Sequence, residues 1–213
     1  IIRAVLNANT EAGLRIPIAM HGTHGIGKTE IVAQMAKEFG YHFVPLYLST
    51  QEAGDLLGLP DKVVGPDGKK MTVYAKPEWL TEAYQFEKTI FFLDEMNRAD
   101  PYILQAMLPF ALEGTIHTHK IKDNDFIISA MNPDTADYNV TAIEDKALLS
   151  RFAHFNFEPE RGEWVDYLMS RDDIHPALLA SVGKSAKIVD NKISVPLDVR
   201  VKCNPDRRSL TKI

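Results

Sequence analysis

Several features that would place a protein in a special class are absent or nearly absent from this sequence. The chain of 213 residues has a single cysteine, Cys203, which excludes an internal disulfide and a cysteine-based zinc site. No apolar run is long enough to cross a bilayer, and the N-terminus shows neither a basic segment nor a signal-peptide core. These absences favour a reducing, cytoplasmic compartment. Because the chain begins with Ile1 and not Met, we expect it to be part of a longer protein.

The sequence also lacks an excess of basic residues. Lys and Arg number 24 against 29 Asp and Glu, which gives a formal net charge of -5. No global positive field therefore predicts binding to nucleic acid or to an acidic membrane, although a local basic surface is not excluded. Apolar residues make up 45% of the chain, enough to bury a core in one large or two small domains.

The most informative stretch is IAMHGTHGIGKT, from Ile18 to Thr29. It fits the pattern G-x-x-x-x-G-K-[ST], preceded by an apolar run typical of a buried strand and followed by apolar residues at helical spacing. Glycines let consecutive N–H groups face a polyphosphate, and the following helix directs its positive dipole end at the anion. The alternative is a glycine-rich turn that only joins a strand to a helix. We predict a nucleoside-triphosphate site whose binding residues are Gly22, Thr23, His24, Gly25, Ile26, Gly27, Lys28, Thr29 and Glu30.

Two side chains of this loop carry specific roles. Lys28 supplies a positive charge for the β- and γ-phosphates, and the hydroxyl of Thr29 is placed to ligate Mg²⁺. The side chain of His24 is expected to face solvent, because the backbone amides make the phosphate cradle.

A second informative stretch is TIFFLDEMNR, from Thr89 to Arg98. Its continuous apolar run predicts a strand buried on both faces that delivers Asp94 and Glu95 at its C-terminal end, the edge where parallel α/β sheets bind ligands. Asp94 is expected to hold Mg²⁺, and Glu95 to polarise the water that attacks the γ-phosphate. The alternative is a pair of solvated carboxylates that merely end a strand. Asn132, after the buried run Phe126 to Met131, is expected beside the same edge.

Two segments read as projections from the sheet. Gly65-Pro66-Asp67-Gly68 is a turn signal between two β-prone arms, Lys62 to Val64 and Met71 to Tyr74, and predicts a hairpin. The strict alternation of TIHTHKI predicts an exposed strand over Thr115 to Ile121, with His117 and His119 on one face. These two histidines lack a carboxylate or cysteine to complete a metal site, so solvent exposure is favoured over metal binding.

The remaining segments are expected to be mainly helical. An Asp100-Pro101 start and a Gly114 stop bound one helix, which Pro109 is expected to kink. A short helix is expected over 142–150 and a last sheet strand over 154–157. After Pro159 the pattern becomes amphipathic, with Trp164, Val165, Leu168 and Met169 on one helix face, and predicts a separate small helical unit.

Together these motifs resemble the AAA+ ATPases, and within them the MoxR-type branch. The resemblance is carried by GTHGIGKT, LDEMNRA, QAMLPFALEGTI, SAMNP and LLSRF in the family's order, and it covers nearly the whole chain. The motifs are also similar to those of the cobaltochelatase ATPase subunit, of gas-vesicle and carboxylase-activase members, and of McrB restriction GTPases. The resemblance implies a RecA-like α/β core with a parallel sheet between helices over 1–158, followed by a small helical lid over 159–213.

The resemblance also implies individual roles. Lys28 and Thr29 match Walker A, and Asp94 and Glu95 match Walker B. Asn132 matches sensor 1, and Arg151 matches the arginine finger that reaches a neighbouring subunit's γ-phosphate. Arg208 matches sensor 2, with Arg207 as the alternative. The segments 49–76 and 115–124 lie where this branch carries a helix-2 insertion and a pre-sensor-1 hairpin.

These observations lead us to expect an ATP·Mg²⁺ hydrolase that forms a homohexameric ring and remodels a protein client. One alternative is a module whose nucleotide binding only fixes its assembly state. Another is a nucleic-acid motor or McrB-like GTPase, whose pore would be lined by the basic residues of the two projections: Lys62, Lys69, Lys70, His117, His119, Lys120 and Lys122. The acidic net charge favours the protein client.

Overall fold

The computed structural model describes residues 2–12, 15–133 and 149–170 of the chain. The chain divides into two compact units, one of residues 1–21 and 29–156 and the other of residues 22–28 and 157–213. The first unit contains the sheet and the helices that cover it. The second contains the glycine-rich loop and the helix α7.

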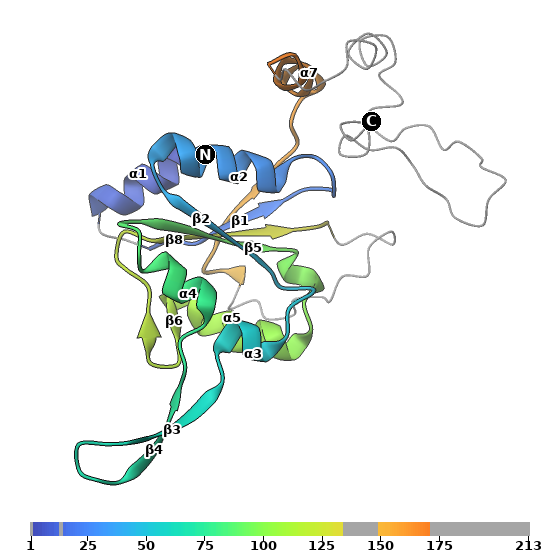
Figure 1. Cartoon of the computed structure of the whole chain (residues 1–213). Coiled ribbons are helices and arrows are strands. Elements are labelled where there is room, and N and C mark those ends of the chain that lie inside the picture. Colours follow the sequence, from blue (N-terminus) through green and yellow to red (C-terminus); the bar gives the residue numbers. More distant parts are fainter. Residues whose placement is uncertain (1, 13–14, 134–148, 171–213) are drawn as a thin grey trace, which may run out of the picture. The chain divides into compact units, whose positions relative to one another are not determined.

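A five-stranded parallel sheet forms the centre of the first unit (Figure 1). The strand order is β2-β5-β8-β1-β9. The strands are β1 (Ile18–His21), β2 (His42–Tyr47), β5 (Thr89–Asp94), β8 (Phe126–Met131) and β9 (Ala153–Asn156). β5 and β8 are buried along their whole length, which explains their unbroken apolar sequences. Pro45 lies in the edge strand β2, where a missing N–H is tolerated.

Helices cover both faces of this sheet (Figure 1). Two lie on one face, α1 (Ile2–Ala12) and α2 (Lys28–Phe39), and three on the other, α3 (Ala53–Leu57), α4 (Glu78–Ala83) and α5 (Pro101–Glu113). An aromatic cluster lies between the sheet and the helices α4 and α5. It consists of Trp79, Phe91 and Phe110, whose rings meet edge to face with centroids 5.2 to 5.5 Å apart. This geometry is favourable for aromatic rings and fixes α4 and α5 against β5.

Helix α5 begins and ends where the sequence predicts. The side chain of Asp100 accepts a hydrogen bond from the N–H of Tyr102, and Pro101 occupies the first turn. Gly114 ends the helix with a φ of 68°, a conformation that residues with a Cβ rarely adopt. Pro109 lies inside the helix without ending it, because α5 continues to Glu113.

Two antiparallel hairpins accompany the sheet. The first, β3 (Pro60–Val64) with β4 (Lys70–Tyr74), confirms the predicted projection. The second, β6 (Thr115–Ile116) with β7 (His119–Lys120), shows that the prediction of one exposed strand over Thr115 to Ile121 is wrong. His117 turns the chain with a φ of 50°, so His117 and His119 do not share a strand face.

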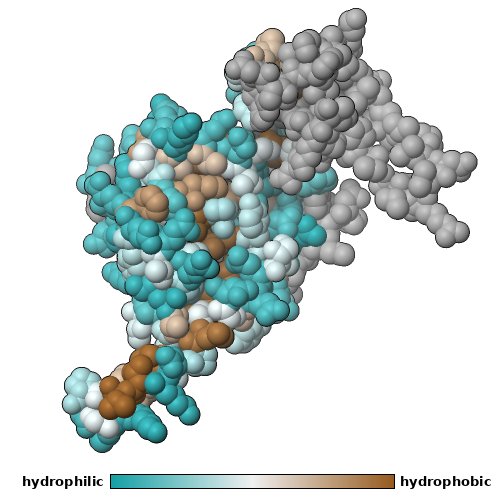
Figure 2. Space-filling view, in the orientation of Figure 1, coloured by the Kyte–Doolittle hydropathy of each residue, from teal (hydrophilic) through white to brown (hydrophobic). Residues whose placement is uncertain are grey.

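The two hairpins contact each other through Tyr74 of β4. Its ring stacks on the His117 ring at a centroid distance of 3.6 Å, and Nε2 of His119 lies 3.0 Å from the Tyr74 carbonyl oxygen. Along β3 and β4, residues opposite each other share a face, which places Val63 and Met71 together. Both are exposed, and Figure 2 shows hydrophobic residues along this projection. The β3–β4 hairpin therefore presents an apolar surface as well as basic side chains.

The described part of the second unit has one helix, α7 (Arg161–Met169). Leu168 is buried, whereas Met169 is 60% exposed, so the predicted apolar face does not include Met169. The expected helix segment 142–148 and the C-terminal positions Cys203, Arg207 and Arg208 lie outside the described residues. In the described ranges, no helix combines the length and apolar character that a membrane crossing requires.

Candidate active site

The glycine-rich loop of residues 22–28 folds back on the ammonium group of Lys28. Its Nζ donates to the carbonyl oxygens of Gly22 at 2.6 Å and Thr23 at 2.8 Å. Gly25 and Gly27 have φ values of 72° and 95°, conformations available to glycine at little cost. A Cβ on Gly22 would lie 2.6 Å from the carbonyl oxygen of Phe157, so this position requires glycine for space.

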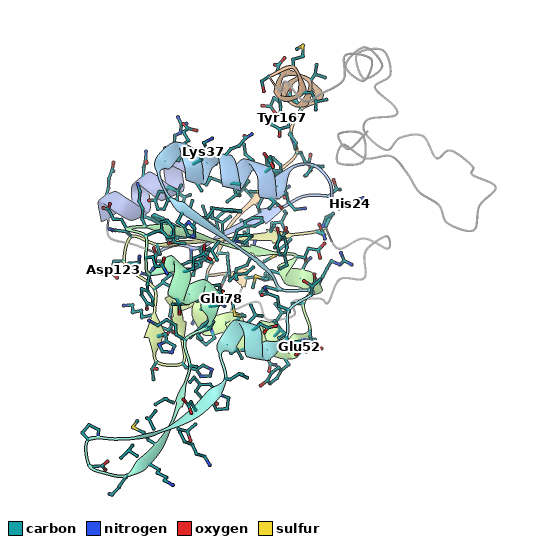
Figure 3. The ribbon with its side chains drawn as sticks, viewed as in Figure 1. His24, Lys37, Glu52, Glu78, Asp123 and Tyr167 are labelled. Carbon is teal, nitrogen blue, oxygen red and sulfur yellow. The ribbon has the colours of Figure 1, made fainter. Side chains whose placement is uncertain are left out.

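The predicted binding residues of this loop differ in exposure. Thr23 and His24 are exposed, and Figure 3 shows the His24 side chain at the loop. Its exposure agrees with the prediction that the His24 side chain faces solvent. Ile26 is half-buried, and Glu30 is exposed in the first turn of α2. The loop backbone and Lys28 are therefore the groups suited to hold phosphate oxygens.

Thr29 and Asp94 form a direct contact inside the first unit. The Thr29 hydroxyl donates to Oδ2 of Asp94 at 3.0 Å, although the two residues are 65 positions apart in sequence. Thr29 belongs to the first turn of α2, and Asp94 ends β5. A hydroxyl and a carboxylate are hard oxygen donors of the kind that Mg²⁺ takes together with waters and substrate phosphates. The pair thus fits the predicted Mg²⁺ site.

Glu95 follows in an unusual backbone conformation. Its φ is 53° and its ψ is 37°, in the left-handed region that residues other than glycine rarely adopt. One carboxylate oxygen accepts from the Ser49 hydroxyl at 2.7 Å, and the other accepts from Arg98 at 2.8 Å. The side chain is 33% exposed. Each oxygen of the predicted general base therefore accepts a hydrogen bond. One comes from Ser49, two residues after β2, and the other from Arg98 in the short helix η1 (Met96–Arg98).

Asn132 is placed by a second asparagine. The side chain of Asn97 donates to the carbonyl oxygen of Asn132 at 2.7 Å and accepts from its N–H at 3.1 Å. Both residues are buried, with exposures of 6% and 4%. This paired contact ties the end of β8 to η1 and so brings Asn132 to the sheet edge that carries Asp94 and Glu95.

Arg151 is exposed in the turn that precedes β9. Among the described residues it makes no ion pair, while its neighbour Phe152 is 5% exposed and belongs to the core. The turn is thus anchored by Phe152, and the arginine side chain extends into solvent. Arg208, with its alternative Arg207, lies outside the described residues, so its predicted role stays a prediction.

Sequence reasoning missed three residues of this site: Ser49, Asn97 and Arg98. Arg98 could have been found, because residues three apart in a helical turn are neighbours. Asn97 sits inside the quoted motif LDEMNRA, but its partner is 35 positions away. Ser49 becomes visible only through the pairing of β2 with β5, where Tyr47 lies opposite Asp94.

Comparison with known proteins identifies the fold and the family of the chain. No curated protein matches the chain. Among solved structures, an ATPase candidate of Cytophaga hutchinsonii is 16% identical with a TM-score of 0.50, over 81% of this chain and 52% of that chain. Two variants of RuvB from Thermotoga maritima are 15% and 13% identical with TM-scores of 0.52 and 0.51, over 79% of this chain and 47% and 48% of theirs.

The chain therefore spans about half the length of these solved structures. At such low identity the likeness shows the fold alone, which is the RecA-like AAA+ arrangement of a parallel sheet between helices predicted from the sequence. A family model also matches the chain, over residues 17–152, which is more than half of its length. The matched part contains the glycine loop, Asp94, Glu95 and Asn132. The model is that of AAA domains, dynein-related subfamily, and the chain belongs to that family.

Proposed function

We propose that this chain is an ATPase that binds ATP with Mg²⁺ and hydrolyses it between subunits of a ring. The observation that carries the proposal is the Thr29–Asp94 hydrogen bond of 3.0 Å, with Glu95 immediately after Asp94. It joins the residue after the glycine loop to the carboxylate end of β5, the pairing that Mg²⁺-dependent phosphoryl transfer requires. Membership of the AAA domain family supports the same activity.

The residues of the chain have separate tasks in this proposal. The backbone of residues 22–28 and Lys28 hold the phosphates, and Lys28 exchanges its carbonyl partners for phosphate oxygens. Thr29 and Asp94 hold Mg²⁺, which when bound neutralises charge on the β- and γ-phosphates. Glu95 orients and polarises the attacking water, and Asn132 positions the water or the γ-phosphate through its amide.

The hydrogen bonds that Glu95 accepts compete with the attacking water for its carboxylate oxygens. A carboxylate that accepts hydrogen bonds from both Ser49 and Arg98 has less capacity to accept one from water. We propose that the described arrangement is a resting one and that rearrangement of Ser49 or Arg98 frees one oxygen of Glu95. The left-handed backbone at Glu95 is compatible with this role, because strained backbone conformations cluster at active sites.

The proposed partner is a protein client, as in MoxR-type remodelling ATPases, and the proposed assembly is a homohexamer in the cytoplasm. The β3–β4 hairpin supports a protein client over nucleic acid. Val63 and Met71 are 37% and 49% exposed on one face of it, and Val64 on the other face is 67% exposed. Exposed apolar groups bind protein surfaces, whereas a phosphate backbone is bound by a basic groove.

The proposal is tested by substitution of Glu95 and Lys28. Glu95→Gln keeps the size of the side chain but cannot polarise water, so ATP affinity should be retained while turnover falls by at least about a hundredfold. Lys28→Ala should weaken ATP binding itself. Glu78→Gln, at an exposed position on α4 (Figure 3), is the matched control and should leave both quantities unchanged.

The measurements are equilibrium binding of a fluorescent ATP analogue and steady-state phosphate release, each repeated with GTP. Near wild-type turnover in Glu95→Gln would show that Glu95 is only a solvated carboxylate. Unchanged ATP affinity in Lys28→Ala would remove the basis of the phosphate site. A clear preference for GTP would replace the ATPase with a GTPase at the same site.

A further inference from the structure

Two histidines lie next to each other where β1, the strand that leads into the glycine loop, pairs with the edge strand β9. His21 is the last residue of β1, and His154 lies in the neighbouring edge strand β9. Their rings are stacked with centroids 5.1 Å apart, and Nε2 of His21 lies 2.7 Å from Nδ1 of His154. Neither residue has a role in the proposed function so far.

The second nitrogen of His154 determines which way this hydrogen bond runs. Nε2 of His154 lies 2.5 Å from the carbonyl oxygen of Leu149, and a carbonyl can only accept. Nε2 must therefore carry a hydrogen, which leaves Nδ1 of the neutral ring as an acceptor. His21 then donates from its Nε2 to His154, and His154 donates to Leu149, so the three residues form a chain of hydrogen bonds.

This series of hydrogen bonds ends in the turn that carries Arg151. The Leu149 carbonyl also accepts from the N–H of Phe152, which closes the turn around Arg151 at 3.2 Å. The N–H of Ala153 donates to the Pro17 carbonyl at 2.8 Å, which fixes the end of the turn to the start of β1. The backbone on both sides of Arg151 is thus tied to β1, and His21 is followed directly by Gly22 of the glycine loop.

We propose that His21 and His154 are positioning residues that couple a subunit's own glycine loop to its Arg151. Movement of His21 when the loop binds nucleotide would be transmitted through His154 and Leu149 to the turn, and so to the arginine offered to the adjacent subunit. The inference rests on the proposed function, because it requires Arg151 to act on a neighbour's nucleotide. It assigns the histidines no contact with nucleotide.

A metal ion bridging the two rings does not fit this geometry. Two nitrogens bound to one Zn²⁺ at about 2.0–2.1 Å lie about 3 Å apart or more for angles near 90–110°, which exceeds the observed 2.7 Å. Within the described ranges there is also no group of three or more His, Cys, Asp or Glu residues that could hold a metal. The hydrogen-bonded pair is the arrangement that the distances support.

The link should affect activity far more than stability. His154 is exposed, and a hydrogen bond at such a site contributes little to folding stability. Arginine fingers, by contrast, are sensitive to position, since a displacement of about 1 Å in a catalytic group can cost up to about a hundredfold in rate. A structural role and a positioning role therefore predict different results.

The test compares His21→Phe and His154→Phe with Arg151→Ala, alone and combined. Phenylalanine keeps a flat ring at each site but forms no hydrogen bond. His154→Phe should lower turnover about tenfold at saturating ATP with ATP affinity unchanged. His21→Phe should cause a smaller loss, because the bond from His154 to Leu149 remains. In the Arg151→Ala background neither substitution should lower turnover further, since both act through Arg151.

His42→Phe is the control. His42 lies in β2 and stacks on Phe86 at 3.6 Å, away from the β1–β9 pair, and its substitution should leave turnover unchanged. Thermal unfolding of each variant reports whether the fold is kept. The inference is overturned if the histidine substitutions lower turnover equally with and without Arg151, if they weaken ATP binding, or if turnover is normal in both. Absence of turnover in the wild-type protein would instead overturn the proposed function.

Discussion

Asn97 shows how a residue without direct chemistry can determine the site. Its side-chain amide makes two hydrogen bonds to the backbone of Asn132, and both groups are shielded from water. Removing the amide would leave a buried N–H and a buried carbonyl without these bonds, and each such group costs about 1–3 kcal/mol. The position of Asn132 therefore depends on Asn97 as much as on strand β8.

We predict that Asn97→Ala lowers the free energy of unfolding by about 2 kcal/mol or more and lowers turnover, because Asn132 shifts. Asn7→Ala, at an exposed position in α1, should change neither and serves as the control. Urea unfolding and phosphate release measure the two effects. If Asn97→Ala unfolds at the wild-type urea concentration, the paired contact does not hold the end of β8.

At the scale of elements, the start of the two central strands depends on a buried carboxylate. Asp125 is 1% exposed and accepts hydrogen bonds from the N–H groups of Thr89 at 2.7 Å and Lys122 at 2.8 Å. Burial raises the pKa of Asp125 above its usual value, and the two backbone hydrogen bonds and the charges of Lys122 and Arg15 lower it only in part. The folded protein thus holds this proton more tightly than the unfolded chain.

Because of this raised pKa, the free energy of unfolding depends on pH. Its contribution to stability is fully present below the unfolded pKa, near 4, and is lost as the pH rises through the folded pKa. Asp125→Asn cannot titrate and loses one of the two acceptors, so it should be less stable than the wild type at acidic pH. We predict that this difference narrows as the pH rises from about 4 toward neutrality.

Urea unfolding at a series of pH values measures this difference. Asp123→Asn is the matched control, because the side chain of Asp123 is 94% exposed in its ion pair with Arg15 and should show little pH-dependent difference. A difference between wild type and Asp125→Asn that stays constant over the pH range would contradict the raised pKa of Asp125.

The elements that sequence predicts well are those whose signals are local. The glycine loop, the buried run of β5 and the caps of α5 each lie within about a dozen neighbouring residues, so pattern and position suffice. The alternation pattern wrongly predicts one strand over Thr115 to Ile121, although the family resemblance implies a hairpin over 115–124. The pattern fails because the turn contains His117 in a left-handed conformation, where glycine or asparagine is the usual signal. Strict alternation continued across that turn and hid it.

Contacts between distant segments cannot be predicted from the sequence, for a different reason. Ser49 meets Glu95 because β2 pairs with β5 in one register, and a shift of one residue would turn Ser49 away. His21 meets His154 because β9 adds beside β1 at the sheet edge. Such neighbours depend on strand order and register, which a single sequence does not specify.

At the scale of the whole molecule, the proposed activity depends on a second copy of the chain. Arg151 is exposed and has no ion pair within the part of the chain that the structure describes, while the residues around it are fixed by backbone hydrogen bonds and by Phe152. An arginine on a rigid base can stabilise charge that develops on a neighbour's phosphoryl group, an effect of about 10³ to 10⁵ in rate. The alternative is a surface arginine, which would contribute little.

Mixing of two inactive variants separates these alternatives. Arg151→Ala subunits keep Glu95 but offer no arginine, whereas Glu95→Gln subunits offer an arginine but cannot activate water. Each should be nearly inactive alone.

In a mixed ring, an Arg151→Ala subunit that receives the arginine of a Glu95→Gln neighbour has a complete site, so turnover should reappear and should vary with the mixing ratio. A double variant carrying both substitutions, mixed with either single variant in the same way, forms no interface that has both an intact Glu95 and an intact Arg151. These mixtures should therefore show no rescue, and they control for subunit exchange. If mixed rings form without regained turnover, or if Arg151→Ala alone hydrolyses ATP normally, Arg151 does not act across the subunit interface.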